Sequence, residues 1–283
     1  MFVSDNKLGT LSHYVLTSLG AMYEQREAMA IRDRLLEYHT GYGRAEMAIR
    51  RDEGMSESTL LAVKRSLRRL LSGEPIQYII GFQWFCGMEL TVSPAVLIPR
   101  PETEELVHAM LERENREHLV VFDVGTGSGC IALALKKMKP TWEVHACDIS
   151  PEALEVAKRN AEQNAIDVIF HQLDILARTP DFKVDILVSN PPYIPIAEKA
   201  SLPALVVNNE PALALFVDDA LIYYRRLAAL SQICLKPGGR LMVEIHERYS
   251  AEVLELLASA GLSNLECYRD MQGKDRGVFG MKK

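Results

Sequence analysis

The 283-residue sequence lacks the features that mark membrane-spanning and secreted proteins. It contains no apolar stretch of about eighteen residues, the length that a bilayer-spanning helix needs, so we expect no membrane association. Its first residues, Met1–Lys7, are too polar for a secretory signal. Together these absences predict a cytoplasmic protein.

Cysteine and histidine are too scattered to indicate a disulfide framework or a metal centre. The five cysteines are an odd number, and no two of them form a C-x-x-C pair. The seven histidines show no H-E-x-x-H spacing. We therefore expect no bound metal.

The chain also lacks an excess of positive charge. Its net charge is −6, and residues 1–75 carry 11 basic and 10 acidic side chains of totals of 32 and 38, which leaves 21 and 28 for the remainder. A protein that binds nucleic acid stably usually presents a basic surface with aromatic side chains among the charges. The sequence therefore predicts no stable nucleic-acid binding.

The pattern of apolar residues divides the chain into three parts. Residues 1–75 show helical spacing, with Ser56 as a predicted N-cap and Gly73 as a predicted C-cap, and indicate a bundle of short helices. Residues 76–98 contain two strand-like runs, Tyr78–Phe85 and Met88–Val92, on either side of Gly87, which predict a β-hairpin linker. Residues 99–283 alternate between strand and helix patterns.

This alternation is typical of an α/β fold with a mostly parallel sheet. The short connection 270–275 predicts that the last two strands form an antiparallel hairpin. We predict seven strands, at residues 119–124, 142–147, 167–172, 184–189, 240–245, 264–269 and 276–281.

The first strand leads into a glycine loop, Gly125–Gly129, which contains Thr126, Gly127 and Ser128 and opens the next helix. Glycine at alternate positions permits a sharp turn and lets a ligand approach the backbone closely. The spacing is G-x-G-x-G, whereas dinucleotide-binding folds have G-x-G-x-x-G, so a nicotinamide cofactor is not indicated.

An acidic residue and a helix start follow the second strand. Asp148 lies 23 residues after Gly125, where a carboxylate commonly accepts hydrogen bonds from both ribose hydroxyls of a bound nucleoside. Ser150 and Pro151 then have the residue types of an N-cap and a first helical position.

The most informative segment is the Asn-Pro-Pro-Tyr corner, Asn190–Tyr193, directly after the fourth strand. Pro191 and Pro192 cannot donate backbone hydrogen bonds and keep the corner stiff. The Asn190 amide oxygen and the Pro191 carbonyl form a pair of acceptors that suits a planar NH₂ group, and Tyr193 offers a ring that can stack on it. A rigid turn without chemistry is the alternative for this segment taken alone.

Four of these positions are expected at one edge of the sheet, because an open parallel sheet binds ligands at the carboxyl ends of its strands. They are Gly125, Asp148, Asp174 and Asn190.

The glycine loop, the acid and the corner resemble those of methyltransferases that use S-adenosylmethionine and act on planar nitrogens. More narrowly, the chain is similar to the HemK family, the protein-(glutamine-N5) methyltransferases of class 1 peptide release factors. The similar segments are Gly73–Gly81, Leu97–Glu104, Asp123–Gly129, Ser189–Tyr193 and Gly273–Arg276.

The resemblance implies a seven-stranded, mostly parallel Rossmann-like methyltransferase sheet with an N-terminal helical bundle that docks the release factor. It implies that S-adenosylmethionine contacts Gly125–Gly129, Asp148 and Asn190, with its adenine against Asp174 and Ile175. Asn190, Pro191, Pro192 and Tyr193 would bind the glutamine and form the catalytic site.

Two further questions stay open from the sequence. The segment with Arg100, Glu102, Thr103 and Glu104 either places Thr103 and Glu104 in the wall of the cofactor pocket or forms an anchoring salt bridge and a helix start. The rival functions are methylation of an exocyclic base amine in DNA or RNA, since that amine is also planar, and a non-catalytic binding scaffold.

Overall fold

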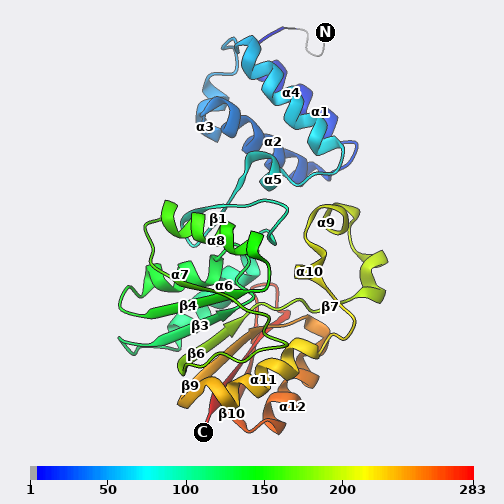
Figure 1. Ribbon diagram of the computed structural model, residues 1–283. Coiled ribbons are helices and arrows are strands. Elements are labelled where there is room, and N and C mark those ends of the chain that lie inside the picture. The colour runs from blue at the N-terminus through cyan, green and yellow to red at the C-terminus, as the bar shows by residue number, and fades with distance from the viewer. Residues whose placement is uncertain (1–4) are drawn as a thin grey trace. The chain divides into compact units, whose positions relative to one another are not determined.

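The computed structural model describes residues 5–283, which form two compact units. The helical unit comprises residues 5–81 together with a short helix from much later in the chain, α9 (Ala204–Asn209). The α/β unit comprises Phe82–Pro203 and Glu210–Lys283. Figure 1 shows both units with their elements labelled. None of the helices within the described residues is long and apolar enough to cross a membrane.

The helical unit confirms the predicted N-terminal bundle. It contains α1 (Leu8–Leu19), α2 (Gln25–Thr40), α3 (Arg44–Ile49), α4 (Glu57–Leu71) and α5 (Ile76–Ile80). The α4 helix begins as predicted, because the Ser56 hydroxyl accepts a hydrogen bond from the Thr59 N–H at 3.1 Å. Gly73 follows the end of α4 with a positive φ of 89°.

The strand expected from Tyr78 onward was wrong in its first part, because Ile76–Ile80 are helical. Pro75 precedes this turn of helix and Gly81 ends it in the left-handed conformation. Ile79, Ile80 and Tyr78 are buried, and α5 packs against α2 and α4. Burial in the bundle therefore overrides the strand preference of a run rich in isoleucine and tyrosine.

The hairpin is shorter than predicted and consists of β1 (Phe82–Phe85) and β2 (Met88–Thr91), which pair antiparallel. Cys86 and Gly87 form its turn, with φ of 47° and 66°. Two successive positive φ values are typical of the two-residue turn whose twist matches that of the flanking strands.

The α/β unit contains the predicted seven-stranded sheet, in the order β10-β11-β9-β6-β3-β4-β5. The pairs among β3 to β6 and between β6 and β9 are parallel, whereas β11 pairs antiparallel with β9 and β10. All seven predicted strands are confirmed. They are β3 (Val120–Val124), β4 (Glu143–Asp148), β5 (Ile169–Gln172), β6 (Val184–Ser189), β9 (Leu235–Glu244), β10 (Leu262–Arg269) and β11 (Asp275–Lys282).

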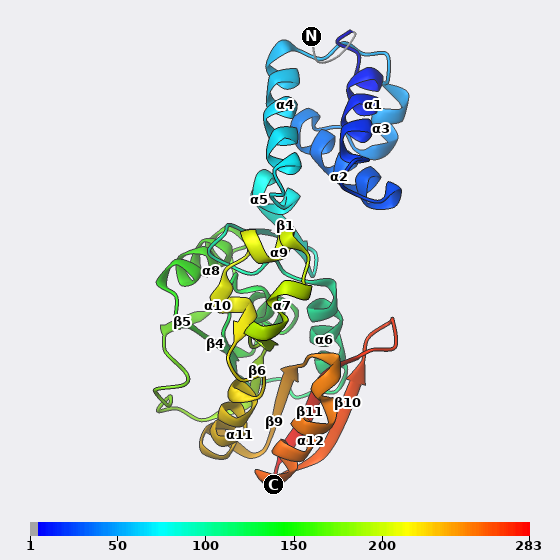
Figure 2. The ribbon, with the colours of Figure 1, turned by 90° about the vertical axis from the view of Figure 1, so that its right-hand side faces the viewer.

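Two hydrophobic clusters lie on opposite faces of this sheet, as the alternation of buried side chains along β3 shows. Val121 belongs to the cluster that includes α6 (Pro101–Glu112) and α7 (Cys130–Met138). Phe122 belongs to the cluster that includes α11 (Ile222–Cys234) and α12 (Ser250–Ser259). Figure 2 shows α12 and α6 on either side of the β9, β10 and β11 strands.

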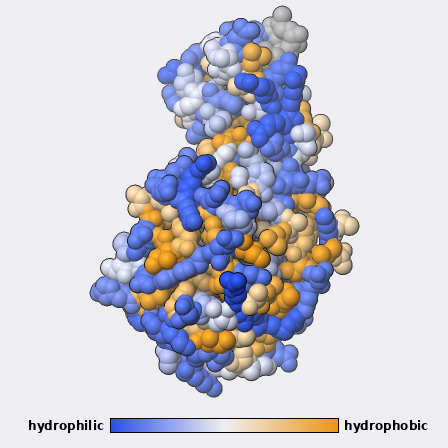
Figure 3. All heavy atoms as spheres, in the orientation of Figure 1, coloured by the Kyte–Doolittle hydropathy of each residue, from blue (hydrophilic) through white to orange (hydrophobic). Residues whose placement is uncertain are grey.

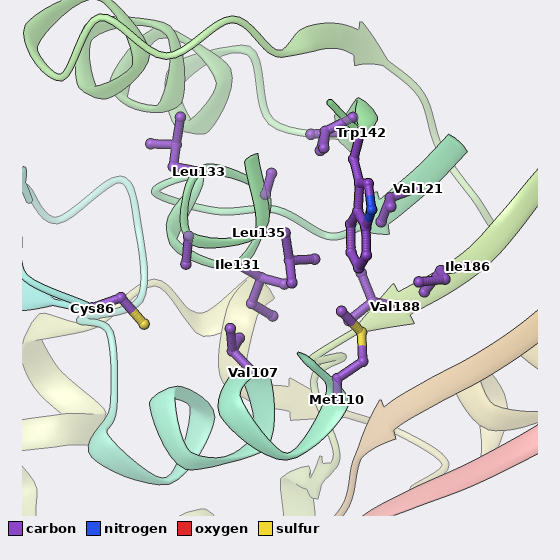
Figure 4. Packing of buried hydrophobic residues seen from close by; sticks show 14 of the residues in the cluster. Cys86, Val107, Met110, Val121, Ile131, Leu133, Leu135, Trp142, Ile186 and Val188 are labelled. Carbon is purple, nitrogen blue, oxygen red and sulfur yellow. The ribbon is translucent and has the colours of Figure 1, made fainter. Parts of the chain in front are cut away.

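Figure 4 shows the first cluster around Trp142, which is fully buried and packs near Val121 and Met110. The indole N–H donates to the Arg116 carbonyl at 3.1 Å, so the polar atom of this large side chain is satisfied. The cluster fixes the position of α7, which begins at the end of the glycine loop.

The helix after β4, α8 (Pro151–Gln163), has a serine cap that allows a first prediction. The Ser150 hydroxyl accepts from the Ala153 N–H at 3.1 Å. We expect Ser150→Ala to lower the free energy of unfolding of the α/β unit by about 1 kcal/mol, because the helix start loses its acceptor. Urea unfolding followed by tryptophan fluorescence measures this, with Ser150→Thr as the control that keeps a hydroxyl. Equal midpoints for the two variants would contradict the assignment.

The connection between β6 and α11 is the longest in the α/β unit. It contains β7 (Ile194–Pro195), a 3₁₀ turn (Ile196–Ser201), α10 (Ala212–Leu215) and β8 (Phe216–Val217), in addition to α9. The β7 and β8 strands pair parallel with each other in a separate two-stranded sheet. The connection contributes Pro211 and Leu213 to the cavity described next.

Candidate active site

A cavity of about 360 Å³ opens at the carboxyl ends of β3, β4 and β6, and residues of the α/β unit alone line it. Gly125, Asp148, Asp174 and Asn190 all lie in its wall, so the structure brings together the four positions that sequence analysis placed at this edge. The wall is mostly apolar with a few polar groups, as is usual for a small-molecule site.

The glycine loop forms one side of the cavity. The Gly125 and Thr126 N–H groups both donate to the Cys147 carbonyl at 2.9 Å, which holds the loop against β4. The Thr126 hydroxyl donates to Asp123 at 2.7 Å, inside the sheet. Gly127 has a φ of 54°, and a Cβ placed there would meet no atom within 4 Å, so its bare backbone faces open space. The loop thus offers main chain, rather than side chains, to a ligand.

Asp148 lies in the cavity wall and forms no salt bridge with any residue from 5 to 283. Its two oxygens accept from the Gly127 N–H at 2.9 Å and the Ser150 N–H at 3.0 Å. Burial raises the pKa of the carboxyl, while these backbone donors act in the opposite direction. Each oxygen keeps a further lone pair, so the group can accept two hydroxyl hydrogens from a ligand.

Asn190, Pro191 and Pro192 line the cavity at the end of β6. The Asn190 Nδ2 donates to the Thr103 hydroxyl at 3.2 Å. Within residues 5–283, the Asn190 Oδ1 accepts no hydrogen bond. Ser189 is the last residue of β6 that pairs with β3 and β9, so the Pro191 carbonyl lies beyond the sheet hydrogen bonds.

Tyr193 is placed differently from the other three residues of the corner. It is absent from the cavity wall, and its ring packs against the hydrophobic cluster under α11 and α12. Its hydroxyl donates to the Glu244 Oε1 at 3.3 Å. The centroid of its ring lies 5.8 Å from that of His246, and the two rings are arranged edge to face. Stacking of Tyr193 on a substrate amide therefore stays a prediction, and the wall beside Asn190 is formed by proline.

Asp174 and Ile175 lie in the wall after β5, where Tyr223 of α11 is a further lining residue. Ile175 is buried, and its carbonyl accepts from the Arg226 guanidinium at 2.6 Å, which ties this wall to α11. Tyr223 was not among the predicted site residues, because nothing in the spacing of α11 separates a cavity-lining aromatic residue from one in the core.

The structure divides the residues at 100–104 between the two expected roles. Arg100 forms a salt bridge of 2.5 Å with the buried carboxylate of Glu210, which also accepts from the Ile98 N–H at 3.3 Å. Arg100 and Thr103 both line the cavity. Glu104 is not part of the wall and lies instead beside Cys86 and His108.

The cavity suits S-adenosylmethionine by the chemistry of its lining. The Ser128 hydroxyl is buried in the wall and has no hydrogen-bond partner within the described residues, as expected of a group that serves a ligand. Asp148 supplies the two acceptors that a ribose diol needs, and Ile175 and Val124 supply apolar surface for a base. The sulfonium of this cofactor is positively charged, and the wall contains the carboxyl groups of Asp148, Glu152 and Asp174.

Comparison with known proteins agrees with this fold and site. A family model described as "Methyltransferase small domain" matches residues 102–202, and one described as "PrmC N-terminal domain" matches residues 16–81. The solved structure of a methyltransferase from Pyrococcus furiosus is similar in fold, with a TM-score of 0.54 and 20% identity, over 77% of this chain and 98% of that one. The α/β unit is thus a methyltransferase domain.

Similar proteins from bacteria narrow the assignment to a family. A release factor glutamine methyltransferase from Bacteroides thetaiotaomicron is 37% identical over 273 residues, 95% of this chain and 98% of that one. A protein of the same name from Bacillus subtilis is 40% identical over 256 residues, 87% of this chain and 89% of that one. The chain belongs to the release factor glutamine methyltransferase family.

Proposed function

We propose that this protein transfers a methyl group from S-adenosylmethionine to the side-chain amide nitrogen of a glutamine in a peptide release factor. The observation that carries the proposal is the Asn190 amide in the cavity wall, with Nδ2 engaged by Thr103 and Oδ1 free to accept. When bound, the cofactor supplies a methyl group activated by a positively charged sulfur.

The residues of the corner help a weak nucleophile to react. The nitrogen of a glutamine amide is a poor nucleophile, because its lone pair is delocalised into the carbonyl. Asn190 Oδ1 and the Pro191 carbonyl each accept one N–H and fix the nitrogen in place. As positive charge develops on that nitrogen, both acceptors bind it more strongly than before, which accelerates the step. The N-protonated amide formed by the transfer is strongly acidic, so water suffices to take one of its two N–H protons, and the methylated amide keeps the other.

The proposed substrate is a class 1 release factor, methylated at the glutamine of its Gly-Gly-Gln tripeptide. A release factor acts in translation, so the proposal also places the reaction in the cytoplasm. The alternative, an exocyclic amine of a nucleic-acid base, is disfavoured by the net charge of −6 and pI of about 5.7.

Tritiated S-adenosylmethionine, offered in parallel with release factor, DNA and RNA, tests this choice. We expect label on the release factor alone, in the peptide that contains Gly-Gly-Gln. A release factor with glutamate in place of that glutamine is the matched control and should stay unlabelled. Label on DNA or RNA would overturn the proposal, and so would label on the control protein.

The helical unit is proposed to grip the protein substrate. Figure 3 shows a surface in which apolar residues lie among hydrophilic ones. On the helical unit, the exposed large apolar side chains are Met22, Tyr38, Ile49, Leu61 and Leu71, and Ile49 is 82% exposed. These exposed side chains are available to contact a protein partner.

We expect a short Gly-Gly-Gln peptide to have a KM at least about tenfold above that of the whole release factor, the effect of about 1.4 kcal/mol of docking energy. Ile49→Asp should raise KM for the whole protein and leave KM for the peptide unchanged. Steady-state methylation with both substrates measures this. Equal KM values for peptide and protein would contradict a docking role.

A further inference from the structure

A chain of hydrogen bonds runs from the Asn190 amide into the interior of the α/β unit. Asn190 Nδ2 donates to Thr103 Oγ1 at 3.2 Å, and Thr103 Oγ1 donates to Glu244 Oε2 at 2.6 Å. The hydroxyl of Tyr193 donates to the other carboxylate oxygen of Glu244 at 3.3 Å. Thr103 and Glu244 are each only 2% exposed.

Three separate elements bring these groups together. Asn190 follows β6, Thr103 lies in the first turn of α6, and Glu244 is the last residue of β9. Thr103 and Glu244 are 141 positions apart in the sequence. A buried carboxylate costs free energy unless it is hydrogen-bonded, and the two oxygens of Glu244 meet this condition through Thr103 and Tyr193.

The direction of each hydrogen bond follows from the inventory of donors. An ionised carboxylate only accepts, so the single proton of the Thr103 hydroxyl is used on Glu244. The Thr103 oxygen then offers only lone pairs to Asn190. Of the two ends of the Asn190 amide, only the NH₂ end can satisfy a lone pair, and the Oδ1 end is left for the cavity.

We propose that Thr103 and Glu244 are positioning residues, which fix the orientation of the Asn190 amide so that its oxygen, not its nitrogen, meets the substrate. This inference rests on the proposed methylation of a glutamine amide. With the opposite orientation, the NH₂ of Asn190 would face the NH₂ of the substrate, and two donors would oppose each other. The substrate nitrogen would lose one of its two acceptors.

The charges around Glu244 make this arrangement sensitive to pH. Burial raises the pKa of Glu244 to about 7, against hydrogen bonding from Thr103 and the nearby Arg276 of β11. Arg276 itself pairs with Asp270 at 3.0 Å. From the other packed elements, Tyr193 approaches one carboxylate oxygen, Tyr224 of α11 donates to the Glu244 carbonyl, and Glu102 of α6 raises the pKa further.

Protonation of Glu244 reverses the direction of these hydrogen bonds. A protonated Glu244 can donate to the Thr103 oxygen, which frees the Thr103 proton to donate toward Asn190. The Asn190 amide is then stabilised with its oxygen turned inward. Turnover should therefore be half of its full value near pH 7, the pKa of Glu244, should approach the full value about one pH unit higher, and should fall further at lower pH.

Thr103→Val and Thr103→Ser separate a positioning role from a structural one. Valine keeps the shape of threonine and removes the hydroxyl, whereas serine keeps the hydroxyl and loses a methyl group. For methylation of whole release factor at pH 8, we expect Thr103→Val to lower kcat roughly 10- to 100-fold, the range expected when a reacting group is misplaced. The kcat of Thr103→Ser should stay within about threefold of the wild-type value, which is smaller than the tenfold effect of about 1.4 kcal/mol.

Controls guard against loss of folding or of cofactor binding. Thr141→Val makes the same chemical change in the exposed turn before β4, at the end of the sheet opposite the cavity, and should leave kcat unchanged. Calorimetry should give similar dissociation constants for S-adenosylhomocysteine with all three variants. Equal kcat for Thr103→Val and Thr103→Ser would overturn the proposal.

Glu244→Gln provides the second readout. Glutamine can accept from or donate to Thr103 but does not titrate, so kcat of this variant should not change with pH, whereas kcat of wild type should fall as the pH drops through about 7. An acid limb that persists in Glu244→Gln would overturn the proposal. If wild type fails to methylate release factor at all, the proposed function fails instead, so the two failures are distinguishable.

Discussion

Asn190→Ala is expected to lower kcat for methylation of release factor roughly 100- to 1000-fold, the range found when one pre-positioned hydrogen-bonding group is removed from a reaction centre. The variant loses the Oδ1 acceptor that the cavity offers to the substrate amide. It also leaves the Thr103 oxygen without its donor, which adds a small cost in stability. Single-turnover assays with saturating cofactor measure the chemical step directly.

Affinity for cofactor should fall much less than kcat in this variant, because Asn190 is one of many residues in the cavity wall. Calorimetry with S-adenosylhomocysteine checks this part of the prediction. Asn164→Ala, in the segment after α8, is a matched control for the same change away from the cavity. If turnover were retained, or if kcat and affinity fell by the same factor, Asn190 would not act on the substrate amide.

Asp148→Ala should have the largest effect on cofactor binding. Hydrogen bonds to a charged group contribute about 1.5–3 kcal/mol, so the loss of this carboxylate should raise the dissociation constant roughly 10- to 100-fold. The Gly127 N–H would also lose its acceptor, which loosens the glycine loop. Calorimetric titration with S-adenosylhomocysteine measures the change.

Asp167→Ala, an exposed residue in the loop before β5, is the matched control and should bind cofactor as wild type does. Turnover of Asp148→Ala should recover toward wild type at high cofactor concentration, because the substrate amide is held elsewhere. An unchanged dissociation constant for Asp148→Ala would exclude its role as the acceptor for a ribose.

The sheet could be predicted because its strands are short apolar runs separated by clear turn and helix signals. The run at 184–189 illustrates this, since it matches β6 at both ends. The β9 strand begins at Leu235, five residues before the predicted start at 240, although Lys236–Gly239 contain a Pro-Gly-Gly run of the kind that marks turns. In the structure, Val184 still pairs with Leu235 across an irregularity in the register.

The error at α5 has a different cause. The run Ile76–Ile80 has strand-forming side chains, and only its flanking residues, Pro75 and Gly81, carried the helical signal. Short apolar runs cannot be assigned by periodicity alone. Here the apolar surface offered by α2 and α4 decides the conformation, and that surface is not visible in the local sequence.

The cavity wall could be predicted in part, because the carboxyl ends of neighbouring parallel strands necessarily meet. The hydrogen bond between Thr103 and Glu244, behind the wall, could not be predicted. Glu244 carries one usable signal, an acidic residue within the apolar run Leu241–Ile245. Nothing in the sequence pairs it with Thr103, because that pairing depends on how α6 packs against the end of β9.

The α9 helix has a consequence for the way this protein can be divided. It groups with the helical unit, and its Asn209 side chain donates to the Gly73 carbonyl at 2.6 Å, although it lies between two segments of the α/β unit. The polypeptide therefore crosses from one unit to the other three times, after Gly81, after Pro203 and after Asn209. A truncated protein that starts at Phe82 would retain a helix whose native neighbours are gone, so the two units are not interchangeable modules joined by a single tether.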